Sequence, residues 1–240
     1  PPSACQWRQP RRPGSAGAAP PRLLCSRLPL QPLQGNGAPG TVGTVACARC
    51  HNPATGFADR RSVPGNTSLG VRFGSRNSQT IYNSVLNTFQ YWDGRRDSLW
   101  SQAVTALENR VQSNFSRLAA AQLIFQRYRA EYEAIFGPMP PFDDALRFPQ
   151  IANPPAFETQ GRPGDGPGGA GLDTYDEMTA GDKSLTDRAV ANFGKAIAAY
   201  EARIVSKDAA FDRFVAGDRN ALAPTAKRGL KLFIGKAFCI

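Results

Sequence analysis

The sequence has very little of several residue types that proteins use to bind metals and to cross membranes. It contains one histidine and two methionines in 240 residues, and five cysteines. No run of apolar residues approaches the roughly 20 that cross a bilayer as a helix, so we expect no membrane span. A single histidine, His51, also limits any imidazole-bound metal or cofactor to one ligand of this type.

Acidic residues are absent from the first part of the chain, where no aspartate or glutamate occurs before Asp59. The net charge is +10, and the arginines of that stretch supply +6 of it, which leaves only +4 for the remainder. No lysine-rich run and no basic stripe interleaved with aromatics occurs, so nucleic acid is excluded as the expected partner. An acidic redox partner is compatible with this mild positive charge. The arginines are Arg8, Arg11, Arg12, Arg22, Arg27 and Arg49.

Residues 1–40 hold nine prolines and five glycines without helical or strand periodicity. Such a composition buries too little apolar surface to offset the entropy of ordering the chain. We therefore predict a disordered tail over residues 1–42. It includes Cys5 and Cys25, to which the sequence assigns no partner.

Cys47, Cys50 and His51 form a C-x-x-C-H motif, the signature of covalent haem attachment. Two thiols at this spacing can join the two vinyl groups of one porphyrin edge, and the following imidazole can bind the iron. A redox dithiol or half of a zinc site are the alternatives. Zinc needs two further ligands, and the other cysteines do not form a second C-x-x-C. The motif therefore predicts haem c, and with it export from the cytoplasm, although no signal peptide is recognisable in the sequence.

Apolar periodicity predicts an all-α fold with long loops. Ser116 is a predicted N-cap, Gly137-Pro138 a helix end, Ser184 to Asp187 a capping box and Pro224 a first-turn proline. Residues 138–183 are rich in proline and glycine and are predicted to be a linker. The expected helices cover residues 77–87, 98–109, 116–136, 184–204 and 224–233.

Five stretches occur in the order found in one family of haem proteins. They are GTVACARCH at 43–51, RNSQTIYN at 76–83, YWDGR at 91–95 with Gln102, FDRF at 211–214, and GLKLFIGKAFC at 229–239. With these stretches, the chain resembles the bacterial di-haem cytochrome c peroxidases and the related methylamine dehydrogenase maturation enzyme. The resemblance runs from about Gly43 to the end of the sequence.

The resemblance implies two cytochrome c-like helical domains with one haem each. Residues 43–137 are then the N-terminal domain that carries the peroxidatic haem, and residues 184–240 are the start of a second domain. Cys239 would open a second C-x-x-C-H motif that is truncated before its second cysteine and histidine.

The resemblance also implies roles for individual residues. His51 matches the proximal ligand of the peroxidatic haem, and Asn77 matches a ligand of a calcium ion. Trp92 occupies the place of a tryptophan that conducts electrons between the haems, and Gln102 that of a glutamine in the distal pocket.

One segment and two single positions depart from the family pattern. The proline-rich tail replaces the region that precedes the haem motif. Leu69 stands where many members have a histidine that closes the resting haem. Gln112 stands where the family has its acid–base glutamate; Glu108 lies one helical turn earlier, on the same face but not at the same position.

The expected function is the reduction of hydrogen peroxide to water with electrons from a small cytochrome c or a cupredoxin in the periplasm. One alternative is haem-dependent oxidation of a partner protein. The other is a plain electron carrier, in which a strong sixth ligand blocks peroxide. A carrier is disfavoured, since the only methionines, Met139 and Met178, lie outside the matching stretches.

Overall fold

A computed structural model describes residues 45–60, 67–151, 160–164 and 174–239. The expected tail over residues 1–42, with Cys5 and Cys25, lies outside the described residues. The chain divides into two compact units, residues 1–204 and 205–240. The described residues form helices and no β-strands, with isolated bridges at Leu69–Phe73 and Gln90–Arg96. The all-α fold class is therefore confirmed.

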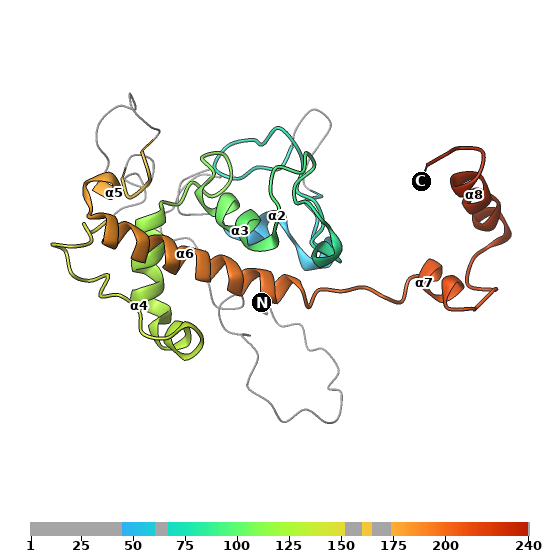
Figure 1. The fold of residues 1–240 in the computed structure, drawn as a ribbon. Coiled ribbons are helices and arrows are strands. Elements are labelled where there is room, and N and C mark those ends of the chain that lie inside the picture. Colours follow the sequence, from blue (N-terminus) through green and yellow to red (C-terminus); the bar gives the residue numbers. More distant parts are fainter. Residues whose placement is uncertain (1–44, 61–66, 152–159, 165–173, 240) are drawn as a thin grey trace. The chain divides into compact units, whose positions relative to one another are not determined.

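The first unit is built around α6, which packs along α3 and crosses α4 (Figure 1). The contact with α3 is close, because a Cβ on Gly194 would lie 2.6 Å from the carbonyl oxygen of Trp100. The helices of this unit are α2 (Cys47–Cys50), α3 (Leu99–Glu108), α4 (Arg117–Phe136), α5 (Thr174–Glu177) and α6 (Ala180–Glu201), with short 3-10 turns η1 (Pro53–Thr55) and η2 (Ser84–Leu86).

Helix α4 has the predicted boundaries. The side chain of Ser116 accepts a hydrogen bond from the Ala119 amide (3.4 Å), and Gly137 ends the helix at φ = +81°. Apolar side chains recur along this helix at three- and four-residue steps, which predicts one buried face: Leu118, Ala121, Phe125, Tyr128, Tyr132 and Ile135. This face is buried through Tyr132, but Ile135 is 51% exposed, so its assignment to the face is wrong. The backbone leaves the helical region at Tyr128 (φ −135°), and the period of the first half does not continue to the helix end.

Two other predicted helices are wrong in extent. The segment 77–87 is irregular apart from η2, because Asn83 adopts a left-handed backbone (φ +59°) that interrupts a helix. Helix α6 starts before Ser184, since the Thr179 side chain caps it by accepting from the Asp182 amide (3.1 Å). The predicted capping box therefore lies inside the helix.

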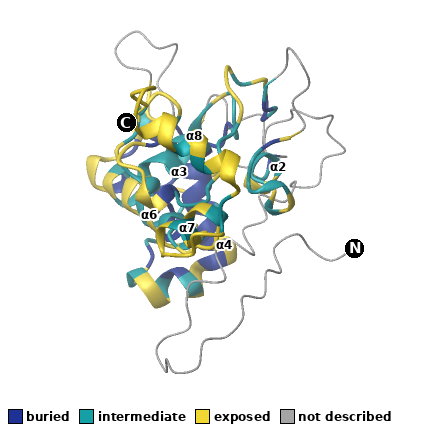
Figure 2. Cartoon of the chain, turned by 90° about the vertical axis from the view of Figure 1, so that its right-hand side faces the viewer, coloured by how far each residue is buried: buried dark blue, intermediate teal, exposed yellow. Residues whose placement is uncertain are grey.

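The hydrophobic core lies between α4, α6 and the segment that follows α4 (Figure 2). Although residues 138–151 contain no helix, their side chains Met139, Phe142 and Phe148 are buried, and the rings of Phe142 and Phe148 lie 4.6 Å apart. From the helices the core takes Leu118, Ala121, Ile124, Phe125, Tyr128, Tyr132, Val190 and Phe193.

The second unit contains α7 (Ala210–Val215) and α8 (Pro224–Ile234). Pro224 occupies the first turn of α8, as predicted. The apolar side chains of Leu232, Phe233 and Ile234 are exposed in this unit. No helix among the described residues is long and apolar enough to cross a membrane.

Candidate functional site

One cavity in the first unit gathers most of the residues that the sequence singles out. Its wall is built by α2, the loops 68–81 and 87–95, η2, α3, the loop 109–113 and the end of α6. Of the candidate residues, Cys47, Cys50, His51, Asn77, Trp92, Gln102 and Gln112 line it. These residues are far apart in sequence, so the tertiary fold brings them together.

The two thiols of the C-x-x-C-H motif lie on the single turn of α2, three residues apart and therefore on one face. Among the described cysteines, Cys47 and Cys50 form no disulfide with each other or with Cys239, and Cys47 is exposed. The Cys50 thiol donates to the carbonyl oxygen of Leu69 at a sulfur–oxygen distance of 3.9 Å. Leu69 thus touches the motif through its backbone, while Ser68 and Gly70 line the cavity.

The His51 ring is fixed by the turn that follows the motif. Its Nδ1 lies 3.0 Å from the carbonyl oxygen of Phe57, and because a carbonyl only accepts, Nδ1 carries the hydrogen. The other nitrogen, Nε2, then has the lone pair that a metal requires. Burial lowers the pKa of His51, against the hydrogen bond to the Phe57 carbonyl and the influence of the Gln79 backbone and of the Asp59 charge. The neutral ring, which is the ligand form, is favoured.

Tyr91 joins the two candidate glutamines. Its hydroxyl donates to the backbone carbonyl of Gln102 (3.3 Å), and the side-chain amides of Gln102 and Gln112 lie near enough to influence its pKa. Burial raises the pKa of Tyr91, although Arg95, Arg96 and the two amides act in the opposite direction. The Arg95 guanidinium lies 3.5 Å from the ring centroid of Tyr91. Sequence reasoning missed Tyr91, whose signal was its place next to Trp92.

A close backbone contact holds Gln112 against the cavity. Val71 and Arg72 donate their amides to the carbonyl oxygens of Gln112 (2.8 Å) and Val111 (3.0 Å). Gly70 lies so near that a Cβ there would be 2.4 Å from the Gln112 carbonyl oxygen. A glycine is therefore required at position 70 for this approach.

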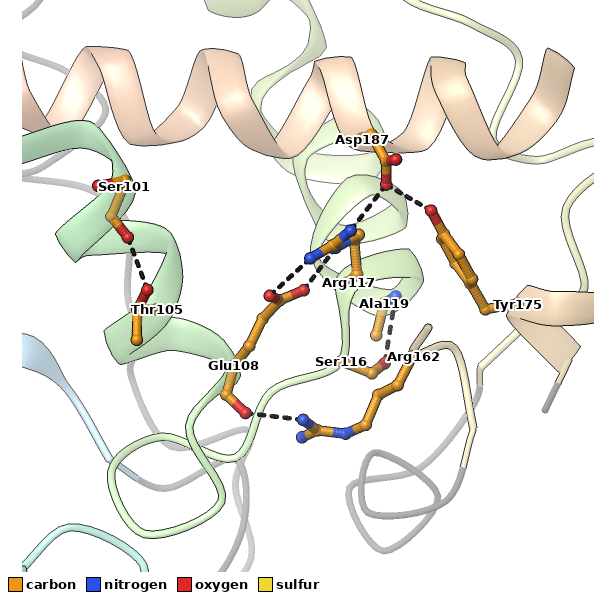
Figure 3. A network of polar contacts seen from close by, with 9 residues as sticks. All are labelled: Ser101, Thr105, Glu108, Ser116, Arg117, Ala119, Arg162, Tyr175 and Asp187. Atoms are coloured by element: carbon orange, nitrogen blue, oxygen red, sulfur yellow. Dashed lines mark hydrogen bonds and ion pairs between the residues drawn. The ribbon is translucent and has the colours of Figure 1, made fainter. Parts of the chain in front are cut away.

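A polar network anchors both ends of the loop that carries Gln112 (Figure 3). The Arg117 guanidinium donates twice to the Glu108 carboxylate (2.6 and 2.9 Å) and once to Asp187 (3.0 Å), which also accepts from the Tyr175 hydroxyl. Arg162 donates to the Glu108 carbonyl (2.7 Å). Burial alone would lower the pKa of Arg117, but the two carboxylates outweigh it and raise the pKa. Because Glu108 pairs with Arg117 and does not line the cavity, it does not replace an acid at position 112.

Trp92 lies at an open part of the wall. Its side chain is 63% exposed, and its Nε1 donates to the carbonyl oxygen of Asn77 (2.8 Å). Asp93 pairs with Arg76 (3.2 Å) and Arg95 (2.7 Å), and the hydrogen bond from Arg95 lowers the pKa of Asp93. No three His, Cys, Asp or Glu side chains gather as a metal site within the described parts of the chain.

A family model described as "Di-haem cytochrome c peroxidase" matches residues 40–220. The chain belongs to the di-haem cytochrome c peroxidase family. Among its relatives, the cytochrome c551 peroxidase of Pseudomonas aeruginosa is 32% identical over 192 residues, which cover 79% of this chain and 42% of that protein. The methylamine utilization protein MauG of Methylorubrum extorquens is 29% identical over 201 residues, which cover 82% of this chain and 43% of that protein. The chain thus spans less than half the length of these relatives.

The fold also agrees with that of a solved di-haem peroxidase. The diheme peroxidase BthA from Burkholderia thailandensis superposes with a TM-score of 0.53 at 20% identity, over 80% of this chain and 42% of that protein. A variant of BthA gives a TM-score of 0.55. At this identity the agreement concerns the fold alone, which is the helical, cytochrome c-like one expected from the sequence.

The cofactor of this family is haem c, and the residues present fit it. Cys47, Cys50 and His51 provide two thiols and a neutral imidazole at one cavity. Cys239 lies in the other unit, near the end of the described chain; it is exposed and forms no disulfide with a described cysteine. Its assignment to a second haem stays a prediction.

Glu201, the last residue of α6, also lines the cavity. It is 8% exposed, and burial raises its pKa to about 7. The sequence did not reveal Glu201, because an amphipathic helix pattern does not distinguish a buried acid at the end of a helix from a solvated one. Only the packing of α6 against η2 places this carboxyl inside.

Proposed function

We propose that this chain is the peroxidatic part of an enzyme that reduces hydrogen peroxide to water with electrons from a small redox protein. The observation that carries the proposal is the shared cavity of Cys47, Cys50, His51, Gln102 and Gln112. It combines the attachment residues for haem c with two amide side chains that can donate hydrogen bonds to a bound oxygen species.

The protein residues have separate tasks in this proposal. Cys47 and Cys50 would hold the haem by thioether bonds, and His51 Nε2 would bind the iron, while the Phe57 carbonyl fixes the ring through Nδ1. When bound, the haem supplies the redox chemistry that cleaves the O–O bond of peroxide.

We expect the cavity that would hold the haem to admit peroxide. The methionines that could close it, Met139 and Met178, are buried in the hydrophobic core and do not line the cavity. Leu69, at the position of the closing histidine, has no lone pair to give. We therefore expect a high-spin oxidised haem that binds cyanide or azide, and a low-spin spectrum insensitive to both would contradict the open site.

Gln112 limits the proton transfer that peroxide cleavage requires. A carboxamide neither accepts nor releases a proton near neutral pH, but its N–H group can donate to a developing oxyanion. General acid–base catalysis contributes about 10²–10⁴ in rate, so we expect slower turnover than in a relative with glutamate here.

The experiment that tests this function is Gln112→Glu in the haem-loaded protein that includes the second domain. The rate of peroxide-dependent haem oxidation, measured by stopped-flow spectroscopy, should rise at least about 10-fold. Gln126→Glu, on the exposed side of α4, introduces the same charge and should leave the rate unchanged. Equal rates in wild type and Gln112→Glu, at an unchanged spin state, would refute a role of Gln112 in the pocket.

A second candidate function is the oxidation of a partner protein through Trp92. The exposed indole of Trp92 lines the cavity and reaches its surface, which suits a relay for electrons. The similarity to the methylamine utilization protein MauG supports this second candidate function. Trp92→Phe should slow electron delivery to the haem while haem oxidation by peroxide keeps its rate; slowing of both would argue against a relay.

Three further expectations belong to this proposal. Asn77 is proposed to bind a calcium ion, Cys239 to attach a second haem, and the protein to work in the periplasm, where haem c is attached. Mass spectrometry of the denatured protein with its second domain counts the haems, and metal analysis tests for calcium.

A further inference from the structure

The cavity that is proposed to hold the haem contains one carboxyl group that the proposed function does not use. Among the described residues that line the cavity, Glu201 alone carries a carboxyl group; the other charged or titratable side chains are Cys47, Cys50, His51, Arg76, Tyr91 and Arg95. Its place is fixed by the backbone, because Ile204, just beyond the helix, accepts a hydrogen bond from the Asn83 amide (3.0 Å) next to η2.

The Glu201 carboxyl has no charged or hydrogen-bonding partner within the described parts of the chain. None of the other charged or titratable side chains of the cavity influences its pKa. Burial is the sole cause that raises this pKa to about 7. The buried hydroxyl of Ser84, which lines the same cavity, has no hydrogen-bond partner among the described residues. A buried carboxyl in this state changes protonation readily when a nearby charge changes.

The reaction proposed for this cavity changes charge and consumes protons. Reduction of one peroxide to two waters takes up two electrons and two protons, and each electron that reaches the haem lowers the charge of the cavity by one. Around a side chain as buried as Glu201, which is 8% exposed, charges interact more strongly than in water. A carboxylate there gains affinity for a proton when the haem is reduced.

We propose that Glu201 takes up one proton from solvent each time the haem in this cavity accepts one electron, and releases it on reoxidation. The electron comes from the redox partner and resides on the haem, while the proton forms the O–H bond of the Glu201 carboxyl. The net charge of the cavity stays constant. The proposal rests on haem binding, as put forward under the proposed function, but it does not require peroxide turnover.

The test is the reduction equilibrium of the haem as a function of pH, measured by spectroelectrochemical titration without peroxide. In the wild type the reduction equilibrium constant should fall tenfold per pH unit in a window around neutrality, which corresponds to about 59 mV. Glu201→Gln, with nearly the same shape and no titration, should remove this dependence. Glu177→Gln, at an exposed acid of α5, should retain it.

Infrared difference spectra between oxidised and reduced protein provide a second readout. A protonated-carboxyl C=O band should appear on reduction in the wild type and be missing in Glu201→Gln. Glu201→Asp, which keeps the acid, should preserve the band and shift the pH window if the Gln variant does not fold.

Two results would overturn the proposal. A wild-type reduction equilibrium that does not change between pH 5 and 9, a range of about two units on either side of the pKa, would show that no proton is coupled. An unchanged pH dependence and band in Glu201→Gln would assign the proton to another group, such as a haem propionate. Failure of the proposed function is a separate result: haem absent by mass, or present without peroxide turnover.

Discussion

Arg117 is the residue whose removal should most clearly reveal what holds the candidate site in place. Its guanidinium bridges the end of α3, through Glu108, and the middle of α6, through Asp187 (Figure 3). Arg117→Met keeps the length and much of the apolar stem but removes all three charged hydrogen bonds. Glu108 is then left with a carboxylate that is only one-fifth exposed and has lost its cation.

The expected loss of stability is about 2–3 kcal/mol. Breaking a fully buried ion pair by removing one partner costs about 3–5 kcal/mol, because the remaining charge stays unpaired. The side chains of Arg117 and Glu108 are 24% and 20% exposed, so water partly solvates the charge that remains and the cost is lower. At this magnitude the folded-to-unfolded ratio changes by roughly 30- to 150-fold.

The measurement is urea unfolding followed by circular dichroism, at fixed pH and with the slope of the transition compared between variants. Arg129→Met is the matched control, since Arg129 pairs with Glu133 one turn along α4 at 54% and 31% exposure. It should cost no more than about 0.5 kcal/mol. Equal losses of unfolding free energy in Arg117→Met and Arg129→Met would refute the reasoning that the Arg117 network stabilises the fold more than an exposed ion pair does.

The remaining predictions concern the cavity itself. Gly70→Ala places a Cβ 2.4 Å from the Gln112 carbonyl oxygen, so it should cost about 1–3 kcal/mol in urea unfolding and weaken azide binding; an unaffected variant would contradict the close approach. Expression with a haem-maturation system should add one haem to this chain by mass, and the double variant of Cys47 and Cys50 to Ser should add none. The Glu201 pKa of about 7 exceeds its ordinary value of 4.5, so this group's contribution to stability is full below pH 4.5 and is lost as the pH rises through 7. Glu201→Gln should therefore be more stable than wild type at pH 8, by up to about 3 kcal/mol, and no more stable at pH 4.

Local signals in the sequence predicted helices where one segment contains its own determinants. Ser116 and Gly137 bound α4, and Pro224 starts α8, because caps and first-turn prolines act on backbone groups a few residues away. The predictions failed where contacts between distant parts of the chain determine where a helix begins and ends. Asp187 satisfies the pattern of a capping box, yet it lies inside α6 and pairs with Arg117, seventy positions earlier in the chain.

The sequence by itself determined the C-x-x-C-H motif of Cys47, Cys50 and His51, since such a motif depends only on residue types at fixed spacing within one turn. Only the tertiary structure decided which other side chains share that cavity. Tyr91 contacts Gln102 and Gln112 because the close approach at Gly70 and the Arg117 network fix the loop that carries Gln112. Glu201 became a buried acid because the end of α6 packs at η2. Burial is a property of the whole fold, and it shifts the pKa of a side chain without any local mark in the sequence.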